Sequence, residues 1–335
     1  MFRSTLVFVS IPLCAALAQE PSAVARAAPP SVVRPVPPAV VRAVPPAVLR
    51  AVPEEFLVPV AAAESLRVTA AGTGPTVVLL PGLFGSAFGY RHLLALLPAA
   101  GYRAVVIEPL GIGGSPRPRG ADYSLTAQAE RIAAALARLD EAGAVVVGHS
   151  LGVSLALRLA AHHPERVRAV IALDGGPAEA AATPGFRRAM RYAPWIKWLG
   201  GVKRIRPKMR KDLLAASGDS AWVTDAVMNG YTAAAAADID GTLLAFLAMA
   251  ESRERDRLAP RLADVRCPVR LVLGTAPHEG GVDEKQVRLM AERLPDFAVD
   301  SIPGAGQYLF EEQPEAVARL IGRVMEERAT VIGRR

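Results

Sequence analysis

The residues with the clearest chemical potential are GHSLG at positions 148–152, which match the pattern G-x-S-x-G. In this pattern the serine occupies a sharp turn between a strand and a helix, so that its Oγ projects above the edge of a sheet. The apolar run 144–147 indicates a strand before the motif, and residues 154–163 indicate a helix after it. A serine hydroxyl in that position can attack a carbonyl carbon if a base takes its proton. Ser150 is therefore the predicted nucleophile.

Two backbone amides are candidates for holding the negative charge that such an attack creates. PGLFG at 81–85 follows the apolar run 76–80, and its amides can point at the developing oxyanion. The amide of the residue after the nucleophile has the same role in sites of this kind. We therefore predict an oxyanion hole formed by the backbone N–H groups of Leu83 and Leu151.

The base is harder to find among the five histidines. His149 precedes the nucleophile, and its backbone position is expected to point its side chain away from Ser150. His92 lies on an expected helix, where a packed or surface role is favoured. His162 and His163 end the helix after the motif, where capping is natural.

His278 differs because it lies on the loop after the apolar run 269–273, at the sheet edge where ligands bind. We predict that it acts as the base for Ser150, with Asp174 or Glu279 as its acid partner. A polar loop residue without catalytic duty is the alternative for His278. Asp174 begins a D-G-G turn, so a turn or cap role stands beside a site-lining role.

Apolar strands alternate with helices over most of the chain, which indicates a parallel sheet covered on both faces. The runs 76–80, 102–107, 144–147, 167–173 and 269–273 are the expected strands, and 123–142 is an expected helix. Residues 175–260 break the alternation, because they are helix-rich, and predict an inserted helical cap. The predicted fold class is α/β, with core segments 56–174 and 261–330 on either side of the cap.

The composition of the first 55 residues is not that of a folded core. Residues 1–18 have a positive start, an apolar stretch and a small-x-small site before Gln19, which predicts a secretory signal peptide. Residues 19–55 are Pro-rich, and PPSVVRPV, PPAVVRAV and PPAVLRAV repeat over 29–52. Paired prolines favour an extended spacer. The predicted location is secreted or periplasmic, without a transmembrane helix in the mature chain.

Composition excludes several classes of function. The 335 residues are 51% hydrophobic and 21% charged, with a formal charge of +7. Ten basic and no acidic residues lie within 186–211, so the remainder of the chain is near −3 (7 − 10). No nucleic-acid-binding motif accompanies this run. No metal-ligand cluster is visible, and GIGGS at 111–115 lacks dinucleotide-binding spacing, so no cofactor or metal is predicted.

The stretch APWIKWL at 193–199 lies within this basic run, and two roles suit the combination of tryptophans and basic residues. The default is a lid whose aromatic side chains line a substrate pocket while its charges face water. The alternative is weak contact with an anionic membrane surface. The sequence does not encode an oligomeric state.

Several stretches together resemble the alpha/beta-hydrolase superfamily, in its capped esterase, lipase and haloperoxidase-like branch. They are LLPGLFGSAFGYRHLL, VVIEPLGIGGSPRP, YSLTAQAERIAAAL, VVVGHSLGVSLALRLAAHHPERVRAVIALD, RCPVRLVLG and IPGAGQYLFEEQPEAV, spanning about 66–325. The resemblance implies a serine nucleophile, an acid after a late strand, and a histidine near the C-terminus.

The chain departs from that pattern at two of the three implied positions. Where the resemblance implies the histidine, this chain has Gln307. After Leu273-Gly274 the implied aspartate is absent. Glutamine can orient a water molecule but cannot carry a proton at neutral pH. The sequence therefore predicts a serine hydrolase of ester or acyl substrates with a non-standard or impaired triad. The alternative is an inactive protein that binds a small molecule in the same pocket.

Overall fold

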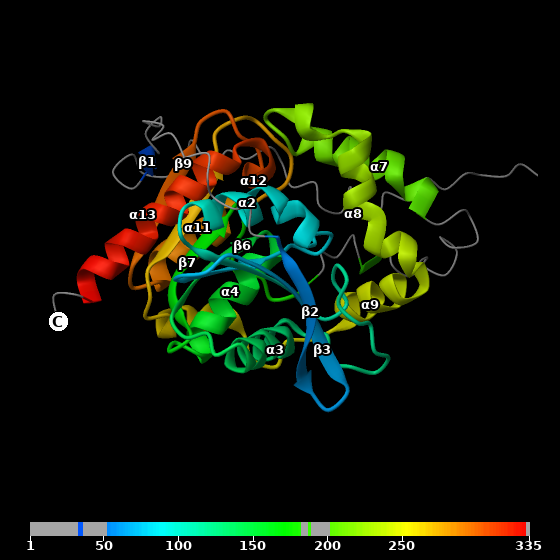
Figure 1. Ribbon diagram of the computed structural model, residues 1–335, viewed down its shortest axis with the longest axis horizontal. Helices are drawn as coiled ribbons and strands as arrows, with labels where there is room; N and C mark the ends of the chain where they lie inside the picture. The colour runs from blue at the N-terminus through cyan, green and yellow to red at the C-terminus, as the bar shows by residue number, and fades with distance from the viewer. Residues whose placement is uncertain (1–32, 36–51, 182–186, 189–201, 333–335) are drawn as a thin grey trace, which may run out of the picture.

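The computed structural model describes residues 33–35, 52–181, 187–188 and 202–332. The predicted signal peptide, nearly all of the Pro-rich segment and the 193–199 motif lie outside the described residues. Within the described part, the polypeptide forms a mixed sheet flanked by helices, with a separate group of helices on one side (Figure 1). The predicted α/β class is confirmed.

The described strands form one sheet of nine in the order β1-β9-β8-β7-β6-β4-β5-β3-β2. β2 is antiparallel to β3 and β3 to β5, whereas the remaining pairs are parallel. The strands are β1 (Val33–Pro35), β2 (Glu54–Ala61), β3 (Glu64–Ala71), β4 (Thr76–Leu80), β5 (Arg103–Glu108), β6 (Ala144–His149), β7 (Val167–Leu173), β8 (Val269–Gly274) and β9 (Phe297–Ile302).

Helices cover both faces of this sheet, as the unbroken apolar strands predict. Successive residues of β4 divide between the faces: Val78 packs in one core cluster and Val77 in the other. The Val78 face is covered by α3 (Leu125–Arg138) and α4 (Leu151–His162). The opposite face is covered by α2 (Arg91–Ala99) and α13 (Pro314–Ile332). The helices thus bury both faces of the central strands and hold their carboxyl ends rigidly.

The remaining helices are shorter or belong to the region predicted as the cap. α7, α8 and α9 gather beside the sheet (Figure 1). No described helix is long and apolar enough to cross a membrane singly; α8 and α9, bent at 88°, meet that criterion only as a pair. The bounds are η1 (Ala87–Tyr90), α7 (Val202–Ala215), η2 (Ser220–Trp222), α8 (Asp225–Ala237), α9 (Ile239–Glu251), α10 (Leu258–Arg261), η3 (Leu262–Asp264), α11 (Glu284–Arg293) and α12 (Leu309–Glu312).

The amino-terminal elements differ in detail from the sequence prediction. β2 begins at Glu54, two residues before the predicted start of the core. Three residues of the Pro-rich segment form β1, which pairs in parallel with β9. The β2–β3 hairpin was not predicted, and neither was β9, because neither segment is an unbroken apolar run. The β2 residues alternate in burial on the exposed outer edge of the sheet.

Candidate active site

The predicted turn at Ser150 is present where β6 ends and α4 begins. Ser150 is the N-cap residue of α4 and has φ 51° and ψ −115°, a conformation that non-glycine residues rarely adopt. A Cβ at Gly148 would lie 2.4 Å from the carbonyl O of Gly152, and a Cβ at Gly152 would lie 2.1 Å from that of Leu80. The motif glycines are therefore required by close backbone contact. Backbone strain of this kind costs about 1–3 kcal/mol and is concentrated at functional sites.

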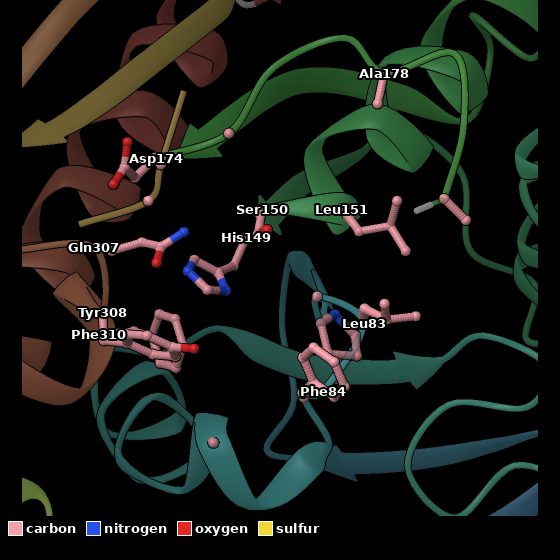
Figure 2. Close-up of a pocket in the computed structure, with 18 of the residues that line it drawn as sticks. Leu83, Phe84, His149, Ser150, Leu151, Asp174, Ala178, Gln307, Tyr308 and Phe310 are labelled. Atoms are coloured by element: carbon pink, nitrogen blue, oxygen red, sulfur yellow. The ribbon is translucent and has the colours of Figure 1, made fainter. Parts of the chain in front are cut away.

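Ser150 borders a cavity of about 230 Å³ at the carboxyl ends of β4, β6 and β7. Figure 2 shows Ser150, His149, Asp174 and Gln307 around this space, with Leu83, Phe84, Tyr308 and Phe310. Its walls come from the strand ends and from two other helices, since Met209 of α7 and Tyr231 of α8 also line it. A concave site of this composition suits a small organic ligand.

The two residues predicted to form the oxyanion hole lie in the wall of this cavity. Leu151 is the first residue of α4, and the first N–H groups of a helix have no partner within it. Leu83 belongs to a turn closed by the N–H of Gly85, which donates to the carbonyl of Gly82 at 2.9 Å. The positive end of the α4 dipole adds to the attraction for an anion here. Leu83 and Leu151 thus line the same cavity as Ser150, and their role as an oxyanion hole stays a prediction.

Asp174 and His278 form a buried pair beside the cavity. Asp174 follows β7 with φ 40° and lines the cavity, whereas His278 is not among the described residues that line it. Their side chains are each 2% exposed, and His278 Nε2 lies 2.9 Å from Asp174 Oδ2. The backbone N–H of Val282 donates to Asp174 Oδ1 at 3.1 Å. The carboxylate is therefore held from two sides.

Both ring nitrogens of His278 are engaged. Nδ1 lies 2.8 Å from the carbonyl of Ala276, which can only accept, and Nε2 faces the carboxylate of Asp174. Burial lowers the pKa of His278, but the hydrogen bond to Asp174, the charge of Asp174 and the Ala276 carbonyl outweigh it and leave the pKa raised. The ring is thus suited to be a cation that donates two hydrogen bonds. As placed, His278 can take a proton from Ser150 only after it leaves one of these contacts, and its role as the base stays a prediction.

Gln307 lies in the cavity wall next to the Asp174 side. Its backbone N–H donates to the carbonyl of Ala216 at 2.8 Å. A Cβ at Gly280 would lie 2.9 Å from Gln307 Oε1, and a Cβ at Gly281 would lie 2.5 Å from Asp174 Oδ2. The carboxamide and the carboxylate therefore lie against consecutive glycines. Gln307, Asp174 and Ser150 all line the same cavity.

His149 is placed differently from the prediction, because its side chain lines the same cavity as Ser150. It is 5% exposed and packs against the rings of Tyr308 and Phe310, at centroid distances of 5.1 and 4.8 Å. Burial lowers its pKa to about 4, against a smaller opposing effect from the backbone of Gln307. Its Nε2 is buried and has no hydrogen-bond partner among the described residues. His149 is therefore a neutral histidine in the site, and the turn geometry that redirects it could not be read from the motif.

Tyr231 is a second site residue that the sequence analysis missed. It lies on α8 of the cap region, lines the cavity and donates its hydroxyl to Glu311 Oε1 at 2.8 Å. The same oxygen accepts from Arg91 at 2.6 Å, and the Glu311 side chain is fully buried. Because these residues are about 80 positions or more apart in the sequence, no local pattern could have associated them.

A family model described as "alpha/beta hydrolase fold" matches residues 75–195, which include the β4 loop, the Ser150 turn and Asp174. Among curated proteins, the chain is 26% identical over 271 residues to "2-(acetamidomethylene)succinate hydrolase" of Mesorhizobium japonicum. That match covers 77% of this chain and 90% of the relative.

Solved structures share the fold at lower identity. The epoxide hydrolase CorEH is 16% identical, with a TM-score of 0.68, and the match covers 82% of this chain and 99% of that one. The meta-cleavage product hydrolase CumD from Pseudomonas fluorescens IP01 is 21% identical, with a TM-score of 0.66. That match covers 82% of this chain and 97% of the CumD chain. At these identities the comparison concerns the fold alone.

Proposed function

We propose that this chain, which has the alpha/beta hydrolase fold and matches the model of that family over residues 75–195, is a serine hydrolase of ester or related acyl substrates. The observation that carries the proposal is the strained conformation of Ser150, which points its side chain into a cavity beside the free end of α4. A chain with no use for the hydroxyl would have no reason to maintain that strain. The curated relative from Mesorhizobium japonicum is named a hydrolase, which supports hydrolysis as the reaction class.

In the proposed reaction, Ser150 Oγ forms a bond to the substrate carbonyl carbon while the carbonyl oxygen becomes an oxyanion. The N–H groups of Leu83 and Leu151 stabilise that oxyanion. Ser150 releases its proton to solvent water, and the departing alcohol takes one up. Collapse of the intermediate breaks the bond to the alcohol and leaves an acyl-enzyme, which water then cleaves to the free acid while restoring the Ser150 hydroxyl.

The proton of Ser150 is the difficulty in this mechanism. Gln307 occupies the place implied for the histidine and cannot accept a proton at neutral pH. Loss of the base costs several orders of magnitude, although oxyanion stabilisation and binding survive. We therefore propose slow turnover, with Asp174 positioned as the acid for a histidine that position 307 lacks. A relocated base at His278 would instead require the ring to leave Ala276 or Asp174.

The alternative function is a protein that binds a small molecule without turnover. It is favoured by the pairing of Asp174 with His278, which occupies the carboxylate that a catalytic histidine would use. The same cavity would then serve for binding alone.

Labelling with a fluorophosphonate distinguishes the two. We expect covalent modification of Ser150, located by mass spectrometry of the digested protein. Ser150→Ala should abolish it. Ser154→Ala is the matched control, because Ser154 lies one turn further along α4 and is fully buried, donating to the Ala178 carbonyl at 3.0 Å. Folded wild-type protein that leaves Ser150 unlabelled would rule out the hydrolase and leave the binding protein.

Export is a separate proposal that rests on the 1–18 segment. Expression in a bacterial host should yield a mature protein that begins at Gln19, as read by amino-terminal sequencing. The contact with an anionic membrane through the 186–211 run should appear as salt-sensitive binding to vesicles containing phosphatidylserine. An unprocessed amino terminus, or equal binding to neutral vesicles, would contradict the respective proposal.

A further inference from the structure

A second cavity adjoins the first and has a different lining. It measures about 100 Å³ and lies between the 83–86 loop, the 111–117 loop and the cap helices α7, α8 and α9. The two cavities share a wall made of the loop residues 83–86 with Met209 and Tyr231. Phe84 is part of that wall and packs edge-on against Phe246 of α9, with ring centroids 5.4 Å apart. In Figure 2, Leu83 and Phe84 lie across the first cavity from Gln307.

The lining of the second cavity is mostly apolar, with hydroxyl-bearing residues Ser86, Tyr231, Thr232 and Thr242 among it. Isoleucine, leucine, phenylalanine, methionine and alanine side chains make most of its surface, and Arg117 is the one charged side chain among the described residues that line it. Arg117 stands at the end of the 111–117 loop, whose glycines 111 and 113 also line the cavity. A guanidinium against an apolar wall is costly unless its N–H groups find acceptors.

The acceptors supplied by the protein do not satisfy this guanidinium. The Arg117 side chain is 10% exposed. Its Nη2 donates to the Gly113 carbonyl, and its Nη1 lies 3.9 Å from Asp238 Oδ2, beyond hydrogen-bond distance. Asp238 is half exposed, and its Oδ1 already accepts from the N–H of Gly241 at the start of α9. The Nε of Arg117 is buried and has no partner among the described residues.

We propose that this second cavity binds an apolar arm of the substrate that ends in a carboxylate, and that Arg117 is the residue that selects it. The inference rests on the proposed function for the placement of the ester at Ser150, and it adds the substrate class: half-esters of dicarboxylic acids, or acyl compounds of the same shape. A carboxylate oxygen accepts from Nη1, which lies 3.9 Å from Asp238 Oδ2, and supplies the counter-charge that Asp238 provides only from a distance.

Binding to the Ser150→Ala protein tests this without any turnover. Isothermal titration calorimetry would compare monomethyl with dimethyl esters of glutaric, suberic and sebacic acids. We expect the monoester to bind about tenfold or more tightly than the diester at one chain length or more, since a hydrogen bond to a charged group is worth that factor. Equal affinities at every length would overturn the proposal.

Variants of Arg117 locate the effect. Arg117→Met should remove the preference for the monoester, so that the ratio of the monoester and diester affinities falls to about one. Arg119→Met is the matched control, because Arg119 is exposed and its substitution changes the net charge by the same amount. A preference that survives Arg117→Met, or is lost equally in Arg119→Met, would overturn the assignment.

Two further results keep the test decisive. If Arg117→Met does not fold, Arg117→Lys retains the charge without the guanidinium Nη1, and the preference should fall but not vanish. An unchanged preference would contradict the role of Arg117. Labelling of Ser150 in the wild-type protein is measured independently. Failure of labelling with an intact monoester preference would refute the hydrolase and keep the carboxylate site, and the opposite pair of results would refute the site alone.

Discussion

Two buried histidines border the candidate site, and their surroundings differ in nearly every respect. His278, on the loop after β8, has an acceptor at each ring nitrogen and a raised pKa. His149, at the end of β6, lies among aromatic rings with one nitrogen unpartnered within the described structure and a pKa lowered to about 4. The loop side thus holds a buried ion pair, while the β6 side holds a neutral ring. Neither is the freely titrating base that a serine nucleophile needs.

The difference shows that proximity of a histidine to a serine does not make a catalytic pair. What decides the role is which groups the ring nitrogens already contact and whether charge is tolerated there. In this chain the position that could meet both requirements is 307, which lies against the same glycine pair as Asp174 and is occupied by glutamine.

The largest expected effect is therefore a gain of activity in Gln307→His. A histidine there can lie between Asp174 and Ser150, and a positioned general base contributes about a hundredfold or more in rate. Hydrolysis of p-nitrophenyl acetate would measure it. An acid added through Pro277→Asp should give no further gain, because Asp174 already lines the cavity.

Two controls give that experiment its meaning. Gln307→Asn should show no gain, and Ser150→Ala in the Gln307→His background should remove it. If a histidine at 307 leaves the rate unchanged, Asp174 stays paired with His278. The site would then not be built around position 307.

Breaking the ion pair should have the next largest effect, on stability. Asp174→Asn removes the counter-charge of His278 at a site where both side chains are 2% exposed. Loss of one partner of a buried pair costs about 3–5 kcal/mol in the free energy of unfolding. Urea denaturation followed by circular dichroism would measure it. A cost below about 1 kcal/mol would mean that the pair is not ionised.

The pH dependence of that cost has a definite sign. The folded-state pKa of His278 is raised, so its stabilisation is fully present below the unfolded value of 6.5 and is lost as pH rises through the folded value. The penalty of Asp174→Asn should therefore shrink toward alkaline pH. A penalty that grows with pH would contradict the protonated ring.

For His149 we expect the opposite pH dependence of the unfolding free energy at acid pH. Its folded-state pKa lies near 4 against 6.5 unfolded, so its contribution is fully present above pH 6.5 and is lost as pH falls toward 4. The difference of about 2.5 units corresponds to about 3 kcal/mol. Between pH 6.5 and 4, His149→Phe should lose less unfolding free energy than the wild type by about this amount. Parallel curves for the two proteins would show that the ring is not neutral.

The smallest expected loss of stability comes from substituting Gly281, which lies against the Asp174 carboxylate. Gly281 has φ +88°, and a Cβ there would meet the Asp174 carboxylate at 2.5 Å, so Gly281→Ala should cost about 1–3 kcal/mol. Gly120→Ala is the matched control, since Gly120 has φ +77° with nothing within 4 Å of its Cβ. It should cost less, because it adds the backbone strain alone. Equal melting temperatures for the two variants would show that the carboxylate is not crowded.

The sequence by itself predicted the elements that local chemistry determines. Apolar runs gave most of the parallel strands, and the spacing of GHSLG placed Ser150 between a strand and a helix, because these features depend on residues close together along the chain. It also located Gln307 and associated Asp174 with His278. It missed β9 and the β2–β3 hairpin, where alternating or polar residues weaken the apolar signal.

Tertiary structure alone decided the states of the ionisable groups and the shape of the site. The sequence could not show that His278 contacts the Ala276 carbonyl, that His149 turns into the Ser150 cavity, or that Tyr231 and Arg117 line the space beneath the cap helices. The physical reason is that desolvation and hydrogen bonding depend on what surrounds a side chain in three dimensions. Residues far apart in the sequence provide those surroundings only after the sheet and the cap have assembled.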